Sequence, residues 1–262
     1  MMEIILSIVF SAILGAVLGS FANVLIIRWH EEAPITGRSR CPGCRKPIRP
    51  RHLVPVLSWI FLKGKCAECH RRIHIQYPIV EASAAVLAVM ASFYAPPFGL
   101  ESPWRYWFLM VLFIGLIVPV VMDLRWKELP VEYLIFLGIC LFIMRYTIYG
   151  TEGLADPFMT LWRDAWAVIA TILFFGLQYL FSGGKWLGSG DILFGAFMAL
   201  TLGWPNILVG IYLAYLIGGM LAILGLISGR LKRRDRIPFA PSLALGTMLA
   251  YLYGEWVIKL LF

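Results

Sequence analysis

Apolar runs of about 20 residues recur along almost the whole chain, and they constrain its fold more than any other feature. A helix of that length spans the hydrocarbon core of a bilayer, which is about 30 Å thick. Hydrophobic residues make up 60% of the 262 residues, above the roughly 45–50% typical of soluble domains. The sequence therefore predicts an all-α polytopic membrane protein with about eight transmembrane helices, at 4–27, 77–95, 105–122, 131–149, 162–181, 191–205, 206–227 and 239–260.

These segments divide the chain into three parts: a first membrane helix at 1–27, a small polar domain at 28–76 and a helical bundle at 77–262. The first helix lacks a preceding basic stretch and is too long for the apolar core of a signal peptide. Segment 191–205 is short. We expect its crossing to begin near Gly190 and to continue through a kink at Pro205.

Positive charge is concentrated in residues 28–76, which hold 11 Lys and Arg against three Glu and so carry the whole net charge of +8. Lys and Arg collect on cytoplasmic loops, so this domain is expected on the cytoplasmic side. The loop "SGRLKRRDRIP" then falls on the same side, and the loops with Glu101, Glu152 and Asp156 fall on the other. Both termini face away from the cytoplasm. We interpret the basic surface as facing membrane lipids rather than nucleic acid.

Two CxxC pairs, "CPGC" and "CAEC", lie within the basic domain and are separated by 21 residues. Such pairs place two thiolates on one turn, and two turns close a tetrahedral zinc site. Four thiolates leave no open position, so the zinc is structural; two disulfides are the weaker interpretation on a reducing side of the membrane. His70 and His74 could replace a ligand, and Cys140 is expected to pack inside a helix. The predicted ligands are Cys41, Cys44, Cys66 and Cys69.

Two carboxylates stand at the same predicted cytoplasmic depth although they are far apart in sequence. Asp123 ends the third segment in "VMDLRWKELP", and Asp191 opens the sixth in "GSGDILF". Two carboxyl groups that meet in a poorly solvated site share a proton, which is the chemistry of aspartic proteolysis. The alternatives are a plain helix cap for Asp191 and an ion pair of Asp123 with Arg125 or Lys127.

Three further residues are candidates near these acids. Gly188 and Gly190 would let an extended substrate backbone approach the carboxylates closely. Glu81, in "YPIVEAS", lies near the start of the second segment. It is either a charge on the substrate side or the partner of a basic residue in the 28–76 domain.

The ordered motifs resemble those of the type IV prepilin peptidases, which are GxGD-type intramembrane aspartyl proteases. The similarity begins with "GSFANVLIIR" and continues through "SRCPGCRKPI", "PVLSWIFLKGKCAECHRRI" and "YPIVE". "DLRWKELP" and "GSGD" are similar to the two aspartate motifs of the family, and "RIPFAPSLALG" to its closing motif. The resemblance covers nearly the whole chain in order.

The resemblance implies that Asp123 and Asp191 are the catalytic pair of an enzyme of the bacterial cytoplasmic (inner) membrane. Its substrates would be prepilins and pseudopilins of type IV pilus and type II secretion systems, cleaved after a glycine at the cytoplasmic face. The new N-terminal residue, usually phenylalanine, would be methylated with S-adenosylmethionine. Gly64 and Lys65 match a pair that the family associates with methylation. Leu193 departs from the family, which commonly has a lysine there.

Two other classes fit parts of the pattern. In an ion-coupled transporter the intramembrane acids would be ion sites, but the sequence has no convincing internal repeat. In a non-catalytic assembly scaffold the zinc domain would organise partners. Inert aspartate-to-asparagine substitutions, combined with loss of function in cysteine variants, would favour the scaffold.

Overall fold

The computed structural model describes residues 2–97, 103–152, 157–229, 232 and 237–261. The described residues are helical apart from turns, and they contain two isolated bridges but no strand. The chain forms two compact units, Met1–Val118 and Pro119–Phe262. The loop acids Glu101 and Asp156 lie outside the described residues, as do 230–231 and 233–236 of the basic loop, and the side chain of Glu152 is not described either.

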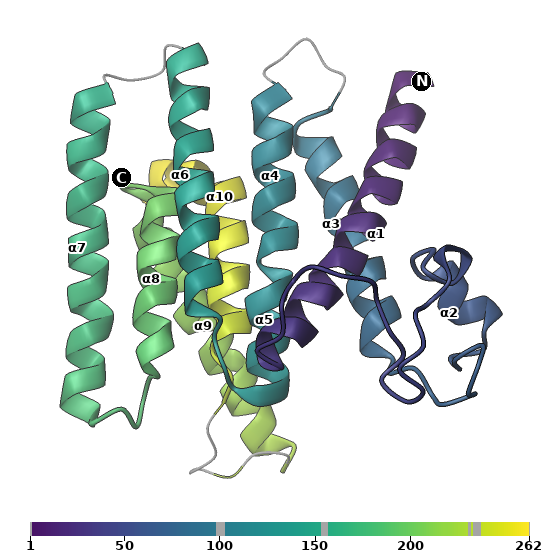
Figure 1. The fold of residues 1–262 in the computed structure, drawn as a ribbon. Helices are drawn as coiled ribbons and strands as arrows, with labels where there is room; N and C mark the ends of the chain where they lie inside the picture. Colours follow the sequence, from purple (N-terminus) through teal and green to yellow (C-terminus); the bar gives the residue numbers. More distant parts are fainter. Residues whose placement is uncertain (1, 98–102, 153–156, 230–231, 233–236, 262) are drawn as a thin grey trace. The chain divides into compact units, whose positions relative to one another are not determined.

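The first unit contains α1 (Met2–His30), the 3₁₀ turn η1 (Pro50–His52), α2 (Leu57–Phe61), α3 (Gln76–Tyr94) and α4 (Pro103–Gly115). Helices α1 and α3 pack against each other (Figure 1). Their contact is a seam of small residues: a Cβ added at Gly15 would lie 2.5 Å from the Cβ of Ala88, and one at Gly19 would lie 2.7 Å from that of Ala84. Close backbone approach of this kind drives helix association within a bilayer.

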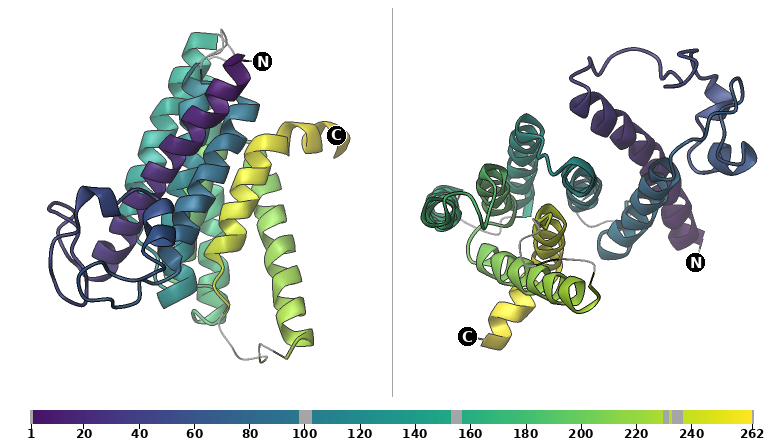
Figure 2. Two further views of the ribbon diagram at one scale, coloured as in Figure 1. Left: turned by 90° about the vertical axis from the view of Figure 1, so that its right-hand side faces the viewer. Right: turned by 90° about the horizontal axis from the view of Figure 1, so that it is seen from below.

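The second unit contains α6 (Val131–Glu152), α7 (Pro157–Ser182), α8 (Ser189–Leu202), α9 (Asn206–Ile227) and α10 (Ala240–Leu261). Helix α5 (Ile117–Trp126) crosses the boundary between the units. The short helix α8 packs against α6, α7, α9 and α10, so it is the centre of this bundle. Helix α10 packs along α9 and bends away near its C-terminal end (Figure 2).

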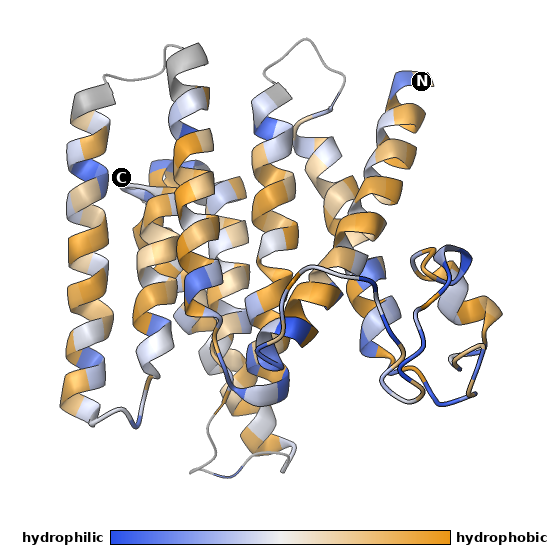
Figure 3. Ribbon diagram, viewed as in Figure 1, coloured by the Kyte–Doolittle hydropathy of each residue, from blue (hydrophilic) through white to orange (hydrophobic). Residues whose placement is uncertain are grey.

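Among the described residues, six helices are long and apolar enough to cross a membrane: Met2–His30, Gln76–Tyr94, Trp104–Trp126, Val131–Ile148, Met159–Ser182 and Asn206–Ile227. They correspond to six of the eight predicted segments. The chain is therefore a multi-pass helical membrane protein, and apolar residues cover most of the length of these helices (Figure 3). The count of eight is not confirmed, because α8 has only 14 residues and α10, with Glu255 and Lys259, is not among the six.

The expectation of a crossing that continues through a kink at Pro205 is wrong. Helix α8 ends at Leu202, and Gly203 follows with φ 67°, a conformation that stops the helix. Helix α9 begins afresh at Asn206, directly after Pro205. The apolar run therefore forms two helices joined by a tight turn, because Gly203 and Pro205 interrupt the helical hydrogen bonding.

Candidate active site and metal centre

The two CxxC pairs fold into knuckles with the same backbone pattern. In each, the N–H of the first cysteine donates to a carbonyl five residues later, and the N–H four residues later donates back to that cysteine. The donor–acceptor distances lie between 2.8 and 3.0 Å, for Cys41 with Lys46 and Arg45, and for Cys66 with Arg71 and His70. A bridge closes each knuckle, Arg40 with Pro47 and Lys65 with Arg72.

The knuckles bring four thiols together at Cys41, Cys44, Cys66 and Cys69, with all sulfur atoms within 4.8 Å of one another. The sulfurs of Cys41 and Cys69 are 3.7 Å apart, far longer than a disulfide and close to the edge of about 3.8 Å implied by a tetrahedron of zinc–sulfur bonds of 2.3 Å. Burial opposes ionisation of Cys41, but backbone N–H groups of Cys44 and Gly43 and the neighbouring thiols lower its pKa to about 7. This donor set fits a structural zinc ion, and neither His70 nor His74 belongs to it.

An ion pair joins the two knuckles. The carboxylate of Glu68 lies 3.3 Å from Lys46 Nζ and 3.3 Å from Arg49 Nη2. The hydrogen bond and the charge of Lys46, together with the charge of Arg49, lower the pKa of Glu68. The contact is exposed, so it orients the knuckles more than it stabilises them.

Gly64 and Lys65 lead into the second knuckle and differ in their surroundings. Gly64 is buried with φ 66°, and a Cβ there would lie 2.9 Å from the ring of Trp59. Lys65 is exposed. Gly64 therefore has a clear structural role, while the association of both residues with methylation stays a prediction.

Glu81 is buried in α3, and its carboxylate accepts a hydrogen bond of 2.7 Å from the backbone N–H of Val56. The predicted tie to the 28–76 domain thus exists, but it goes to a backbone donor rather than to a basic side chain. A role for Glu81 toward substrate stays a prediction.

Asp191 lies in the first turn of α8 and is buried. Its Oδ2 accepts a 2.8 Å hydrogen bond from the N–H of Gly188, and its own N–H donates to the Gly188 carbonyl. The N-cap of α8 is therefore Gly188 and not Asp191, which stands three residues later and bonds back to the N-cap N–H. The hydrogen bond from Gly188 holds one carboxylate oxygen of Asp191 in place and does not involve the other oxygen.

Asp123 lies in α5, also buried, and its Oδ2 accepts a 2.8 Å hydrogen bond from the N–H of Ala240, the first residue of α10. A helix N-terminus favours a negative charge. The closing motif of the chain thus contacts the first aspartate motif through its backbone. Of the basic residues weighed as partners, Lys127 interacts electrostatically with Asp123, and Arg125 lies over the ring of Trp126 at 4.4 Å.

The two aspartate motifs meet within the second unit. A Cβ added at Gly190 would lie 2.8 Å from Cδ1 of Leu129, so the "KELP" stretch packs directly on the "GSGD" turn. Asp191 is close enough to Asp123 for their charges to interact. The room that Gly190 provides is filled by Leu129 of the same chain, and contact of Gly188 or Gly190 with substrate stays a prediction.

Aromatic residues pack beside this pair. The hydroxyl of Tyr215 donates to Gln178 Oε1 at 2.8 Å, and its ring meets that of Phe239 edge to face at 5.3 Å. Phe239 precedes Ala240, the donor to Asp123. Leu193 is half-buried in α8, at the place where the family resemblance leads one to expect a lysine.

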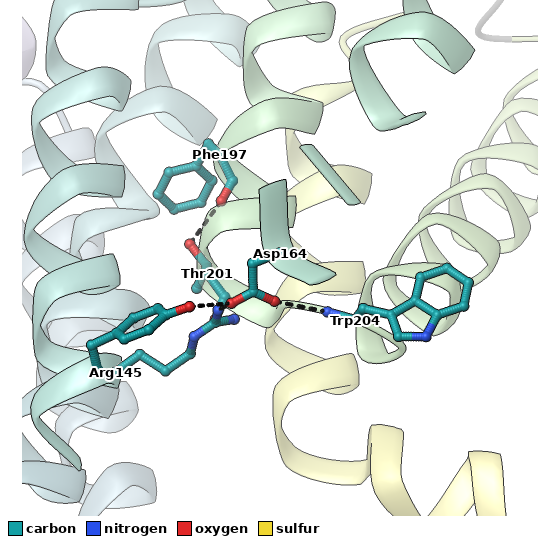
Figure 4. Close-up of polar contacts among 6 residues, drawn as sticks. Arg145, Asp164, Phe197, Thr201 and Trp204 are labelled. Atoms are coloured by element: carbon teal, nitrogen blue, oxygen red, sulfur yellow. Dashed lines mark hydrogen bonds and ion pairs between the residues drawn. The ribbon is translucent and has the colours of Figure 1, made fainter. Parts of the chain in front are cut away.

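The sequence interpretation missed a buried ion pair in the same unit. Arg145 of α6 and Asp164 of α7 are paired, with side chains 5% and 4% exposed (Figure 4). Asp164 also accepts from the Tyr146 hydroxyl and the Trp204 N–H, each at 3.2 Å, while Arg145 donates to the Thr201 carbonyl at 3.3 Å. The signal was available, since both charges stand inside predicted membrane segments.

Comparisons with known proteins find similar sequences along most of the chain. Residues 13–95 match the model of the bacterial peptidase A24 N-terminal domain, and residues 110–223 match that of the type IV leader peptidase family. The prepilin leader peptidase/N-methyltransferase of Bacillus subtilis (strain 168) is 34% identical, over 97% of this chain and 96% of the relative. Proteins of the same name from Stutzerimonas stutzeri and Neisseria gonorrhoeae are 28% and 27% identical, over 94% of this chain in each case and 90% and 91% of the relatives.

No solved structure matches the chain. The family models together reach both structural units, and the similarity to the Bacillus subtilis protein extends over nearly all of both chains. The chain therefore belongs to the type IV leader peptidase family.

Proposed function

We propose that this protein cleaves the leader from type IV prepilins and pseudopilins at the cytoplasmic membrane face, with Asp123 and Asp191 as the catalytic pair, and N-methylates the new N-terminus. One observation carries the peptidase half. Two buried carboxyls from separate motifs lie in one unit, near enough for their charges to interact, and the motifs touch through Leu129 and Gly190. Cleavage follows a glycine in the leader, as in the family the sequence resembles.

The chemistry follows from a pair that holds one proton between two carboxyls. The ionised member takes a proton from water, which attacks the scissile carbonyl carbon, while the neutral member donates its proton to the carbonyl oxygen. The tetrahedral intermediate then collapses, the C–N bond breaks, and a proton passes to the leaving amine. The N–H groups of Gly188 and Ala240 hold the two carboxylates in place during these transfers.

S-adenosylmethionine supplies the methyl group for the second activity. Of the two residues that the resemblance points to, Gly64 is closed against Trp59, so Lys65 offers the side chain that is free to reach a methyl donor. The zinc cluster holds the segment that carries Lys65, since Lys65 precedes a ligand directly. The zinc itself is structural in this proposal.

The membrane arrangement completes the proposal. The chain crosses the cytoplasmic membrane eight times, with α8 and α10 as the two crossings beyond the six long apolar helices. The zinc domain and both aspartates face the cytoplasm, and both termini face the outer side. The charge of the segment 28–76 supports this orientation.

Asp123→Asn and Asp191→Asn variants, each co-expressed with a prepilin, test the peptidase. Both are expected to leave the leader uncleaved, because an amide can neither accept nor donate the shared proton. Glu132→Gln, an exposed acid in the first turn of α6, is the matched control and is expected to process normally. Wild-type cleavage by either asparagine variant contradicts the catalytic pair.

A mass spectrum of the cleaved substrate tests methylation separately. Lys65→Ala is expected to cleave normally and to leave the new N-terminus unmethylated. Transfer of labelled methyl from S-adenosylmethionine at the wild-type rate by this variant would remove Lys65 from the proposal. Loss of cleavage together with methylation would show a structural role instead.

A further inference from the structure

In the short helix α2 of the basic domain, the usual distribution of buried and exposed side chains is reversed. Ser58 is buried, and Trp59 points inward, with its Nε1 donating to the Ile73 carbonyl at 3.3 Å. The large apolar side chains point outward instead: Ile60 is 56% exposed and Phe61 is 80% exposed. A helix in contact with water normally buries such residues.

The apolar surface continues onto the residues before the helix. We call it the α2 patch, formed by Leu53, Val54, Leu57, Ile60 and Phe61, each at least 41% exposed. It borders a shallow hollow of about 370 Å³. Water-facing domains seldom expose contiguous apolar surface of this kind unless it binds something.

A hydrogen bond fixes the depth of the patch along the membrane helices. Val56, directly before α2, donates its N–H to the carboxylate of Glu81 at 2.7 Å. Glu81 stands five residues inside α3, which is about 7–8 Å along the helix axis. The start of α2 is therefore level with the body of a membrane helix rather than beyond its end, and in Figure 1 α2 lies at the height of the first half of α3.

Val56, whose N–H makes this hydrogen bond, has a strained backbone conformation. Val56 has φ 61° and ψ −53°, and the N–H of Leu57 bonds back to the Pro55 carbonyl, which makes a γ-turn. A β-branched residue with positive φ is a rare outlier. Such strain persists where the surrounding structure holds it for a purpose, and here it sets α2 at the level of Glu81.

The basic residues around the α2 patch indicate what kind of partner it binds. Residues 28–76 carry a net charge of +8, and Arg51 lines the hollow beside the patch while Lys63 follows α2. Lys and Arg near an anionic leaflet are attracted to its negative surface. Apolar side chains bordered by basic ones are the pattern of a segment that lies in the plane of the interface.

We propose that the α2 patch is a membrane anchor that inserts into the boundary between headgroups and acyl chains of the anionic leaflet beside α1 and α3. The inserted side chains are those of the patch, and Arg51 and Lys63 contact the lipid phosphates. The zinc domain then lies against the membrane surface and is not held there only by its connections to α1 and α3. This inference does not rest on the peptidase or methyltransferase activity.

Photocrosslinking of the full-length protein in lipid nanodiscs tests the anchor. Benzoylphenylalanine is placed at Phe61, and in a control variant at Ala67, which is exposed between the ligands of the second CxxC pair. Phe61 is expected to give several-fold more phospholipid adduct than Ala67, by mass spectrometry. The yield is expected to rise when phosphatidylglycerol replaces part of the phosphatidylcholine.

The zinc content of each variant reports whether the domain is folded, so the crosslinks are compared at equal zinc occupancy. Equal lipid adducts at the two positions would overturn the anchor. Crosslinks from Phe61 to a second copy of the protein in place of lipid would overturn it too, because the patch would then be an interface between copies. A yield that ignores lipid charge would overturn the role given to the basic residues.

Discussion

Separating the buried ion pair between Arg145 and Asp164 is the sharpest perturbation of the second unit. Asp164→Leu leaves the guanidinium of Arg145 without its counter-ion, and it removes the acceptor for the Trp204 N–H and the Tyr146 hydroxyl. Arg145→Met leaves the carboxylate of Asp164 buried instead. Breaking one side of a buried pair costs about 3–5 kcal/mol of the free energy of unfolding.

The double variant Arg145→Met/Asp164→Leu has no buried charge left at this site. Its remaining cost comes from the hydrogen bonds lost by the Thr201 carbonyl, the Trp204 N–H and the Tyr146 hydroxyl, at about 1–3 kcal/mol for each group that water does not reach. The double variant is therefore expected to lose clearly less than the sum of the two single losses. The difference is the coupling energy of the pair.

Thermal unfolding of purified protein in detergent measures these losses. Each single variant is expected to lower Tm by roughly 6–20 °C, from the range of 2–4 °C per kcal/mol for a domain of this size. Thr201 and Asp191 lie ten residues apart on α8, about 15 Å. Prepilin processing per folded molecule should therefore stay close to wild type, and losses in the two single variants that simply add in the double variant would refute the reasoning.

Three further variants have expected outcomes. Gly190→Ala places a Cβ 2.8 Å from Leu129 and is expected to cost about 1–3 kcal/mol in thermal unfolding, partly recovered when Leu129 is shortened to Ala. Gly64→Ala at φ 66° is expected to cost about 1–3 kcal/mol and to make the zinc domain more sensitive to limited proteolysis. Cys41→Ser is expected to lose bound zinc by elemental analysis, whereas Cys140→Ser, outside the cluster, keeps it.

Each of these has an outcome that contradicts it. An unchanged Tm for the alanine at 190 would mean that the two aspartate motifs do not pack as described. Wild-type resistance to protease for the alanine at 64 would remove the close contact with the Trp59 ring. Full zinc content in the serine variant at 41 would exclude that thiol as a ligand.

The membrane helices and the cysteine cluster could be predicted from the sequence because both depend on local sequence patterns. An apolar run of sufficient length predicts a spanning helix whatever its neighbours, and the CxxC spacing places two thiols on one turn. The four thiols then met as predicted. The break between α8 and α9 was misjudged, since Gly203 ends the helix before Pro205 could kink it.

Contacts between helices were harder to predict. Arg145 and Asp164 could be recognised as costly charges inside apolar segments, but nothing in the sequence says that they pair with each other. Gly190 was interpreted as room for substrate, while the structure fills that room with Leu129. Such pairings depend on how helices pack, and one sequence carries no direct record of it.

The donor to Asp123 is a backbone N–H, that of Ala240, and this has a consequence for genetics. Nineteen amino acids at position 240 present the same N–H to the carboxylate, so a scan of side chains there reports on packing and not on this hydrogen bond. Proline alone removes the N–H, and it is otherwise well tolerated at the first residue of a helix such as α10. Part of what surrounds the proposed catalytic acid is thus invisible to all but one substitution.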